Sequence, residues 1–286
     1  MSLFGMVQLS TAPVRNRDAC DEAARLLCSR HGAMRRTRLS QQIPQQIRCM
    51  TACAIILITA SVAGQSTPPD KRLHAGKLLY ADDFTHGLAA WRVEMEKPGT
   101  VTAKSGVLDI DVPAGMTVWL RQKLDGPVMI QYEANVISAN GPNDRVSDLN
   151  SFWMATDRAT PKDLFEHPRS GKFAEYNTLN MYYVGLGGNG NTTTRFRRYI
   201  GDETERPLLP QNDLSVSRQR SIGIVANKWQ TVTLIADGHL IQYWRGTEKI
   251  FEMVDPEPYT QGWFGIRTTK NHMQVRHLRI VRLIAN

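Results

Sequence analysis

The sequence is poor in cysteine, and the positions of its cysteines exclude several kinds of chemistry. All four cysteines lie in the first 53 of the 286 residues, at Cys20, Cys28, Cys49 and Cys53. The remainder of the chain therefore has no disulfide, no thiolate nucleophile and no zinc–thiolate site. A chain that needs no disulfide is compatible with a bacterial periplasm or the extracellular space.

Three catalytic motifs are also missing. There is no Gly-x-Ser-x-Gly elbow, and the seven histidines include no i, i+4 pair of the zincin type. Gly185–Gly190 is rich in glycine, but no Lys-Ser/Thr pair and no helical pattern follow it, so we interpret it as a wide turn and not as a phosphate loop. Nothing therefore predicts a serine hydrolase of the elbow type, a zincin or a P-loop nucleotidase.

Positive charge is confined to one end of the chain. The formal net charge is +8, but residues 1–50 hold eight arginines and only three acids. The other residues comprise 27 basic and 24 acidic side chains, a net charge of +3. Because this part has no basic run, we predict no nucleic-acid partner.

Residues 1–64 are predicted to form an export signal region. Arg35, Arg36, Arg38 and Arg48 precede an uncharged apolar run at 51–63, which is shorter than the roughly 20 residues that span a bilayer. The run ends in small residues typical of a signal cleavage site. The part before Met34 is long for such a region, so we expect the start at Met34, and a periplasmic or secreted chain without membrane contact after cleavage. The alternative for the apolar run at 51–63 is a buried strand or helix of the folded protein.

The remaining chain alternates between short strand-like runs and turns. We interpret 65–76 as a polar linker and 77–286 as one domain, expected to be a monomer. Asp237-Gly238 between two alternating runs predicts a hairpin. Residues 157–173 predict a long charged loop with a short helix near Asp163. The pattern predicts an all-β fold, a jelly-roll sandwich of two antiparallel sheets.

One stretch of this pattern is unusually polar. Asn180 and Tyr182 share one face of a strand-like segment, and Arg195, Arg197 and Tyr199 share one face of the next. Joined by a glycine- and asparagine-rich turn, these side chains are predicted to form a single sheet face. Such a face is too polar for a core and suits a polar, anionic carbohydrate.

Several runs resemble a known group of proteins. Residues 228–246 and 262–267 resemble the closing strands of concanavalin-like jelly rolls. Residues 152–156, 180–183 and 195–198 resemble bacterial jelly-roll proteins of glycan utilisation, in particular the uncharacterised YesU-like group. The resemblance implies a jelly roll and a carbohydrate partner containing uronate or rhamnose. Related jelly rolls include glucanases, polysaccharide lyases and carbohydrate-binding modules, and the fold alone does not choose between them.

The favoured hypothesis is a lyase that acts by β-elimination. Such a reaction neutralises a uronate carboxylate, removes the C5 proton and protonates the leaving oxygen. Arg197 is a candidate clamp, because a guanidinium matches a carboxylate bidentately. Tyr182 or Tyr199 is the candidate acid or base, and His272 or His167 the base. The candidates for substrate binding are Trp153, His167, Glu175, Asn180, Arg195 and Arg267. The alternative is that the arginines pair with Glu175 or Asp202 and only solvate the sheet.

Two other functions remain open. A glycoside hydrolase could use Glu175 and Asp157 as its two carboxylates, although the Glu-x-Asp-x-x-Glu pattern of jelly-roll glucanases is absent. A non-catalytic carbohydrate-binding protein could stack sugars on aromatic side chains such as Trp153. No cofactor is predicted. Residues 143–148 carry oxygen ligands, but their spacing is not that of an EF-hand, so solvated loop acids are favoured over calcium.

Overall fold

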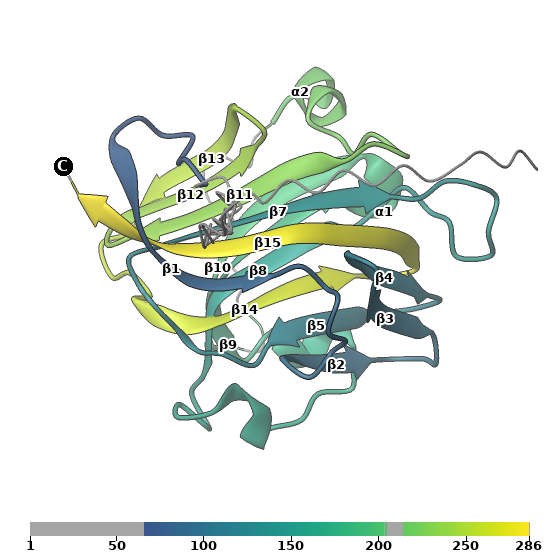
Figure 1. The fold of residues 1–286 in the computed structure, drawn as a ribbon, viewed down its shortest axis with the longest axis horizontal. Coiled ribbons are helices and arrows are strands. Elements are labelled where there is room, and N and C mark those ends of the chain that lie inside the picture. Colours follow the sequence, from purple (N-terminus) through teal and green to yellow (C-terminus); the bar gives the residue numbers. More distant parts are fainter. Residues whose placement is uncertain (1–65, 203, 205–213, 286) are drawn as a thin grey trace, which may run out of the picture. The chain divides into compact units, whose positions relative to one another are not determined.

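The computed structural model describes residues 66–202, 204 and 214–285. The predicted export region lies outside them. Two antiparallel sheets pack face to face (Figure 1), which confirms the predicted all-β sandwich. Among the described residues, no helix has the length and hydropathy needed to cross a membrane.

The larger sheet has eight strands. Their order is β13–β12–β11–β7–β15–β4–β3, and β1 pairs with β15. The strands are β1 (Leu73–Asp82), β3 (Thr100–Lys104), β4 (Val107–Val112), β7 (Val128–Val136), β11 (Gln230–Asp237), β12 (Leu240–Arg245), β13 (Glu248–Val254) and β15 (Asn271–Ala285). The β11–β12 hairpin at Asp237-Gly238 is confirmed, and β1 begins inside the residues predicted to be a linker.

The smaller sheet has seven strands. Their order is β10–β9–β8–β14–β5–β2, and β6 pairs with β14. The strands are β2 (Trp91–Met95), β5 (Met116–Leu120), β6 (Leu124–Asp125), β8 (Leu149–Asp157), β9 (Leu179–Gly187), β10 (Thr193–Ile200) and β14 (Gln261–Thr268). A Cβ at Gly262 would lie 2.3 Å from the carbonyl carbon of Met154, so only glycine allows β14 to lie this close to β8.

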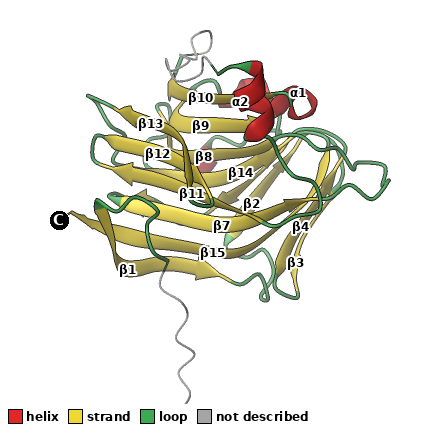
Figure 2. Cartoon of the chain, turned by 90° about the horizontal axis from the view of Figure 1, so that it is seen from above, coloured by secondary structure: helices red, strands yellow, loops and turns green. Residues whose placement is uncertain are grey.

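Helices are short and lie at the ends of strands. The long loop between β8 and β9, at the bottom of Figure 1, contains the 3₁₀ turns η1 (Leu164–Glu166) and η2 (Phe173–Tyr176). The short helix predicted near Asp163 is therefore found, and the Asp163 carboxylate caps it by accepting from the Phe165 N–H at 2.9 Å. The helices α1 (Gly188–Asn191) and α2 (Val216–Ser221) lie beside β9 and β10 (Figure 2).

The main core fills the space between the sheets. Alternate residues of the strands point into it, as in β7, where Ile130, Tyr132 and Ala134 are fully buried. Tyr132 contacts Phe264 of the other sheet, with ring centroids 5.8 Å apart. Two smaller apolar clusters cover parts of the outer faces, one on each sheet. The polar residues of the outer faces are therefore the candidates for a functional site.

Candidate functional site

The predicted polar face is divided between the two sides of the smaller sheet. In the β9–β10 ladder, Tyr182 is opposite Arg198, whereas Arg197 is opposite Tyr183. Residues directly opposite share a face, so Tyr182 points into the core and Arg197 points outward. The prediction of one face with Tyr182, Arg197 and Tyr199 is therefore wrong. The number of residues in the turn after Gly187 sets the register between β9 and β10, which the alternation of side chains along each strand does not determine. A shift of one residue would move every side chain of one strand to the opposite face of the sheet.

Tyr182 and Trp153 lie together in the interior. Both are fully buried, with ring centroids 5.6 Å apart. The Tyr182 hydroxyl donates to Asp255 at 2.6 Å, and Asp255 also accepts from Arg198 at 2.8 Å. Burial first, and then the bond to Asp255, raises the pKa of Tyr182. Trp153 and Tyr182 are therefore core residues, and among the described residues the only charged group that hydrogen-bonds to Tyr182 is the buried Asp255.

A row of polar side chains crosses the outer face of the smaller sheet. We call it the polar row, and it is defined by register across six strands. Its members, in order across the sheet, are Glu94, Thr117, Arg267, Asn150, Gly185 and Arg195. The next row includes Tyr183 and Arg197, and Tyr199 follows beyond it. The structure thus brings together four predicted residues, namely Arg195, Arg197, Tyr199 and Arg267.

Tyr183 completes the polar row at Gly185. A Cβ at Gly185 would lie 2.2 Å from the Tyr183 hydroxyl oxygen, so this hydroxyl lies directly over the glycine. Gly185 is flanked by Asn150 on one strand and Arg195 on the other. The phenol therefore occupies the place in the row that the missing side chain leaves open. Within the described part of the chain, its hydroxyl makes no hydrogen bond.

Arg267 lies in the middle of the row and is buried. Its side chain is 1% exposed and is stacked between aromatic rings, with Phe173 at 4.9 Å and Tyr176 at 4.8 Å. Its Nη1 donates to Thr117 Oγ1 and to the Gly171 carbonyl, each at 2.9 Å. Its Nε is buried without a partner. Its neighbour Asn150 is 2% exposed, and the Oδ1 of Asn150 is also unpartnered.

The charges of this face favour an anion and a neutral phenol. Burial lowers the pKa of Arg267, which remains a cation at neutral pH because guanidinium titrates so high. Burial raises the pKa of Tyr183, and the neighbouring Tyr199 and Asp148 raise it further. Tyr183 is therefore a proton donor at neutral pH, beside two or more arginines.

The loop between β8 and β9 covers the lower part of the same face. Leu164 and Tyr176 pack on Phe152, Trp119 and Tyr183 of the sheet. The Tyr176 hydroxyl donates to buried Glu94 at 2.8 Å, which also accepts from the Trp119 indole at 2.9 Å. The loop is thus held down by both apolar packing and buried hydrogen bonds.

His167 and Glu175 lie in this loop. They line a pocket of about 610 Å³ with Arg169, Ser170 and Asn177, among others. The His167 Nδ1 is 3.1 Å from Asp157 Oδ2, and the same oxygen is bound by the buried Arg169. Glu175 accepts from the Ser170 hydroxyl at 2.6 Å and from its N–H at 2.5 Å. Hydrogen bonds from Ser170, opposed by partial burial, leave the pKa of Glu175 below its usual range.

The other predicted residues lie apart from the polar row. His272 is on β15 of the larger sheet, between Asp144 at 3.1 Å and Asp109 at 3.3 Å. Asn180, the second residue of β9, is opposite Ile200, away from Arg267 and Asn150 in the register. Their predicted roles stay predictions, but these two residues do not join the group described above.

No metal site is evident in the part of the chain that the structure describes, where no group of three or more His, Cys, Asp or Glu side chains could hold an ion. In the loop at 143–148, Asn143 donates to Asp111 at 2.9 Å, and Asp144 accepts backbone N–H groups of Ala139 and Gly141. These hydrogen bonds shape the loop and attach it to Asp111 of β4.

Sequence reasoning missed Asn150, and it offered Tyr183 only as an aromatic on which a sugar could stack. The sequence signal for Asn150 is a lone amide in the apolar run Leu149–Ala155. A polar side chain inside a strand that is otherwise buried on both faces indicates a specific partner. For Tyr183 no comparable signal exists, because Tyr182 next to it has the same chemistry and only the register separates them.

Comparisons with known proteins support the fold. No curated protein matches the sequence. A Bacillus subtilis protein of unknown function with a galectin-like fold matches 75% of this chain and 100% of its own, at 16% identity and a TM-score of 0.59. An endo-β-1,3-glucanase from Pyrococcus furiosus matches 76% of this chain and 100% of its own, at 8% identity and a TM-score of 0.47. A Bacillus subtilis carbohydrate-binding module, CBM66, matches 68% and 96%, at 8% identity and a TM-score of 0.44.

The likeness to the galectin-like protein agrees with the jelly-roll architecture described above, whereas membership of the YesU-like group stays a prediction. One family model matches residues 110–278, more than half of the chain, and this range includes every member of the polar row except Glu94. The chain therefore belongs to the family described as Domain of unknown function (DUF6250).

Proposed function

We propose that this protein is a carbohydrate-active protein that holds an acidic glycan on the outer face of its smaller sheet. The observation that carries the proposal is the pair of unpartnered buried atoms, Arg267 Nε and Asn150 Oδ1, on side chains directly opposite in the β14–β8 ladder. Leaving a buried polar group unsatisfied costs about 1–3 kcal/mol. A ligand that supplies hydrogen bonds to this row would recover that cost.

The charge of the face selects the ligand class. Arg195, Arg197 and Arg267 lie on the same face, and a guanidinium fork matches a carboxylate in plane and spacing. The Asn150 amide and the Tyr183 hydroxyl lie between Arg267 and Arg195, and hydroxyls of a sugar suit them. A sugar acid combines both kinds of group. This agrees with the glycan partner that the sequence resemblance implies.

β-Elimination is the reaction that we propose for this face. The arginines would neutralise the uronate carboxylate, and Tyr183, whose raised pKa keeps it protonated, would donate to the leaving oxygen. For the removal of the C5 proton we propose His167, whose Nδ1 lies against Asp157 and whose Nε2 is left to accept. Asp157 is engaged by Arg169 and His167, which disfavours it as one of the two carboxylates of a hydrolase.

The test measures binding and turnover separately. Oligosaccharides from pectin, rhamnogalacturonan, alginate and glucuronan are titrated calorimetrically into the full chain, and polymer turnover is followed by ultraviolet absorbance of the unsaturated product. We expect Arg195→Gln and Asn150→Ala each to weaken binding about tenfold, since one hydrogen bond to a charged group contributes about 1.5 kcal/mol. Arg218→Gln, an exposed arginine on α2, is the matched control and should bind normally.

The outcomes separate the two parts of the proposal. Binding without any unsaturated product would overturn the lyase and leave acidic-glycan recognition. No binding to any of the four acidic glycans would overturn both. Equal binding by the Arg195 and Asn150 variants would show that the glycan lies elsewhere.

A further inference from the structure

A second pocket opens over the outer face of the larger sheet. It has a volume of about 500 Å³, within the usual range for small-ligand sites. Its walls come from several segments that are distant in sequence, namely 66–67, 81–83, 131–133, Thr231 and 277–279. None of these residues belongs to the polar row or to the loop between β8 and β9.

A β-bulge shapes this pocket. Arg276 is opposite Glu133, whereas Arg279 is opposite Gln131, so β15 has one more residue than β7 between these pairs. His277 occupies the bulge with φ of 54°, a left-handed conformation in which histidine, like asparagine and aspartate, is enriched among residues other than glycine. The bulge turns His277 and Arg279 toward the pocket.

The pocket offers donors and acceptors that the protein does not use. Arg279 makes no hydrogen bond or ion pair within the described residues, and its Nε is buried without a partner. Gln131 donates through Nε2 to Thr233 at 3.0 Å, which leaves its carbonyl oxygen to accept. Glu133 binds Arg276 through Oε2 alone, at 2.7 Å, and this arginine is fixed by stacking on Trp229 at 4.0 Å.

The charge of the pocket differs from that of the polar row. Three acids line it, Asp82, Asp83 and Glu133; Glu133 is paired with Arg276 and lies 3.4 Å from His277, which leaves the two aspartates against Arg279. A carboxylate would be repelled by this surplus of negative charge. Neighbouring hydroxyls of a neutral sugar suit it, because they can accept from a guanidinium and donate to a carboxylate or amide oxygen.

We infer that this pocket is a second binding site, distinct from the polar row, and that it takes a neutral sugar unit. Arg279 donates to the sugar, and Gln131 and Glu133 accept from it. The inference concerns a different face and a different ligand charge, so it does not require that the polar row binds an acidic glycan.

The experiment titrates the full chain with cellohexaose, laminarihexaose, mannohexaose and xylohexaose by calorimetry. We expect at least one of them to bind, and Arg279→Gln to weaken that binding about tenfold or more. Gln131→Ala should weaken it less, and serves in place of Arg279→Gln if circular dichroism shows that this variant does not fold. Arg218→Gln should bind like the unaltered chain.

Three results would overturn the inference. The first is that no neutral oligosaccharide binds at millimolar concentration. The second is binding that neither Arg279→Gln nor Gln131→Ala weakens. The third is an oligouronate that binds at this pocket as tightly as the neutral sugar and is weakened by the same variants. Loss of acidic-glycan binding in the Arg195 variant would leave the inference unaffected, because that arginine lies on the other sheet.

Discussion

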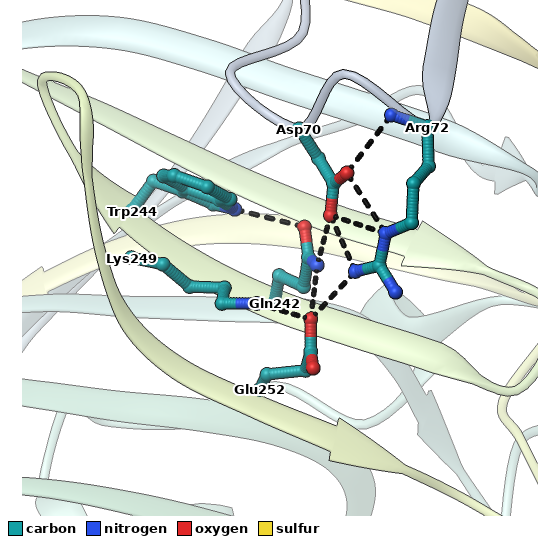
Figure 3. A network of polar contacts seen from close by, with 6 residues as sticks. All are labelled: Asp70, Arg72, Gln242, Trp244, Lys249 and Glu252. Carbon is teal, nitrogen blue, oxygen red and sulfur yellow. Dashed lines mark hydrogen bonds and ion pairs between the residues drawn. The ribbon is translucent and has the colours of Figure 1, made fainter.

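The outer faces of the two sheets both carry a buried polar group next to an apolar cluster, but they satisfy it differently. On the larger sheet, the chain at Asp70 and Arg72 covers Gln242 and forms a closed network with Glu252 (Figure 3). The Gln242 amide donates to Asp70 and to Glu252, each at 2.6 Å, and accepts from the Trp244 indole at 2.8 Å. On the smaller sheet, Arg267 and Asn150 keep atoms without partners.

This difference separates structure from function. In the network of Figure 3 each buried polar group has a partner inside the protein, so the network needs no ligand to be stable. We call this group of Asp70, Arg72, Gln242 and Glu252 the clasp. In the polar row, Arg267 Nε and Asn150 Oδ1 have no protein partner, and a bound ligand that hydrogen-bonds to them would lower the free energy of the folded state. Unpaired buried groups also occur in the core, at Trp153 Nε1 and Tyr243 Oη, so they indicate a binding surface only where they lie on an outer face.

The largest expected effect tests the cover of the smaller sheet. Asp157 and Arg169 form an ion pair whose side chains are 2% and 1% exposed. Asp157→Asn leaves the Arg169 charge buried without its counter-ion, and we expect the free energy of unfolding to fall by about 3–5 kcal/mol. Urea unfolding followed by tryptophan fluorescence measures it.

The control removes the orphaned charge as well. The double variant Asp157→Asn, Arg169→Met should recover part of the loss, because no unpaired charge remains in the interior. If Asp157→Asn costs less than about 1 kcal/mol, the pair behaves as a surface ion pair and the loop is not held by it.

The sequence predicts some features of the two sheets and of the polar row, but not others. Alternation predicted the strands on both sheets, and Asp237-Gly238 predicted its hairpin, because both signals are local. The faces of β9 and β10 were not predictable, because they depend on how many residues the turn at 188–191 uses. Arg195, Arg197 and Tyr199 were placed together correctly, whereas Tyr182 was exchanged for Tyr183. The opposition of Arg267 and Asn150 joins residues more than 100 positions apart and required the sheet order.

The next effect concerns the polar row itself. Gly185→Ala introduces a Cβ 2.2 Å from the Tyr183 hydroxyl, so the buried ring has to move. Overpacking of this kind costs about 1–3 kcal/mol of unfolding free energy. Because the displaced hydroxyl leaves the row between Asn150 and Arg195, we also expect acidic-glycan affinity to fall about tenfold.

A second glycine distinguishes displacement of the Tyr183 ring from a general effect of replacing glycine by alanine. Gly190 lies in the turn after β9, where no atom is within 4 Å of the position of a Cβ. Gly190→Ala strains a left-handed residue and lowers stability, but it should leave glycan affinity unchanged. Unchanged affinity in both variants would remove Tyr183 from the binding surface.

The smallest effect tests the clasp on the larger sheet. Hydrogen bonds from Arg72, with further bonds from Gln242 and opposed by partial burial, hold the pKa of Asp70 well below its usual range. A carboxylate with a depressed pKa stabilises the fold above its unfolded pKa of about 3.9, and this contribution is lost as the pH falls through the folded value. Because the Arg72 side chain is 59% exposed, we expect Asp70→Asn to cost only about 1 kcal/mol at neutral pH.

The pH dependence identifies this contribution. Stability of the unaltered chain should decline below about pH 4 more steeply than that of Asp70→Asn, because the variant has already lost the titrating group. Lys249→Gln, at the exposed end of the same network, removes a 2.7 Å contact to Glu252 and should cost about 0.5 kcal/mol or less. If the free energy of unfolding falls with pH equally in the unaltered chain and in Asp70→Asn, the Asp70 carboxylate does not stabilise the clasp through its hydrogen bonds. The clasp would then differ from the polar row in burial and not in hydrogen bonding.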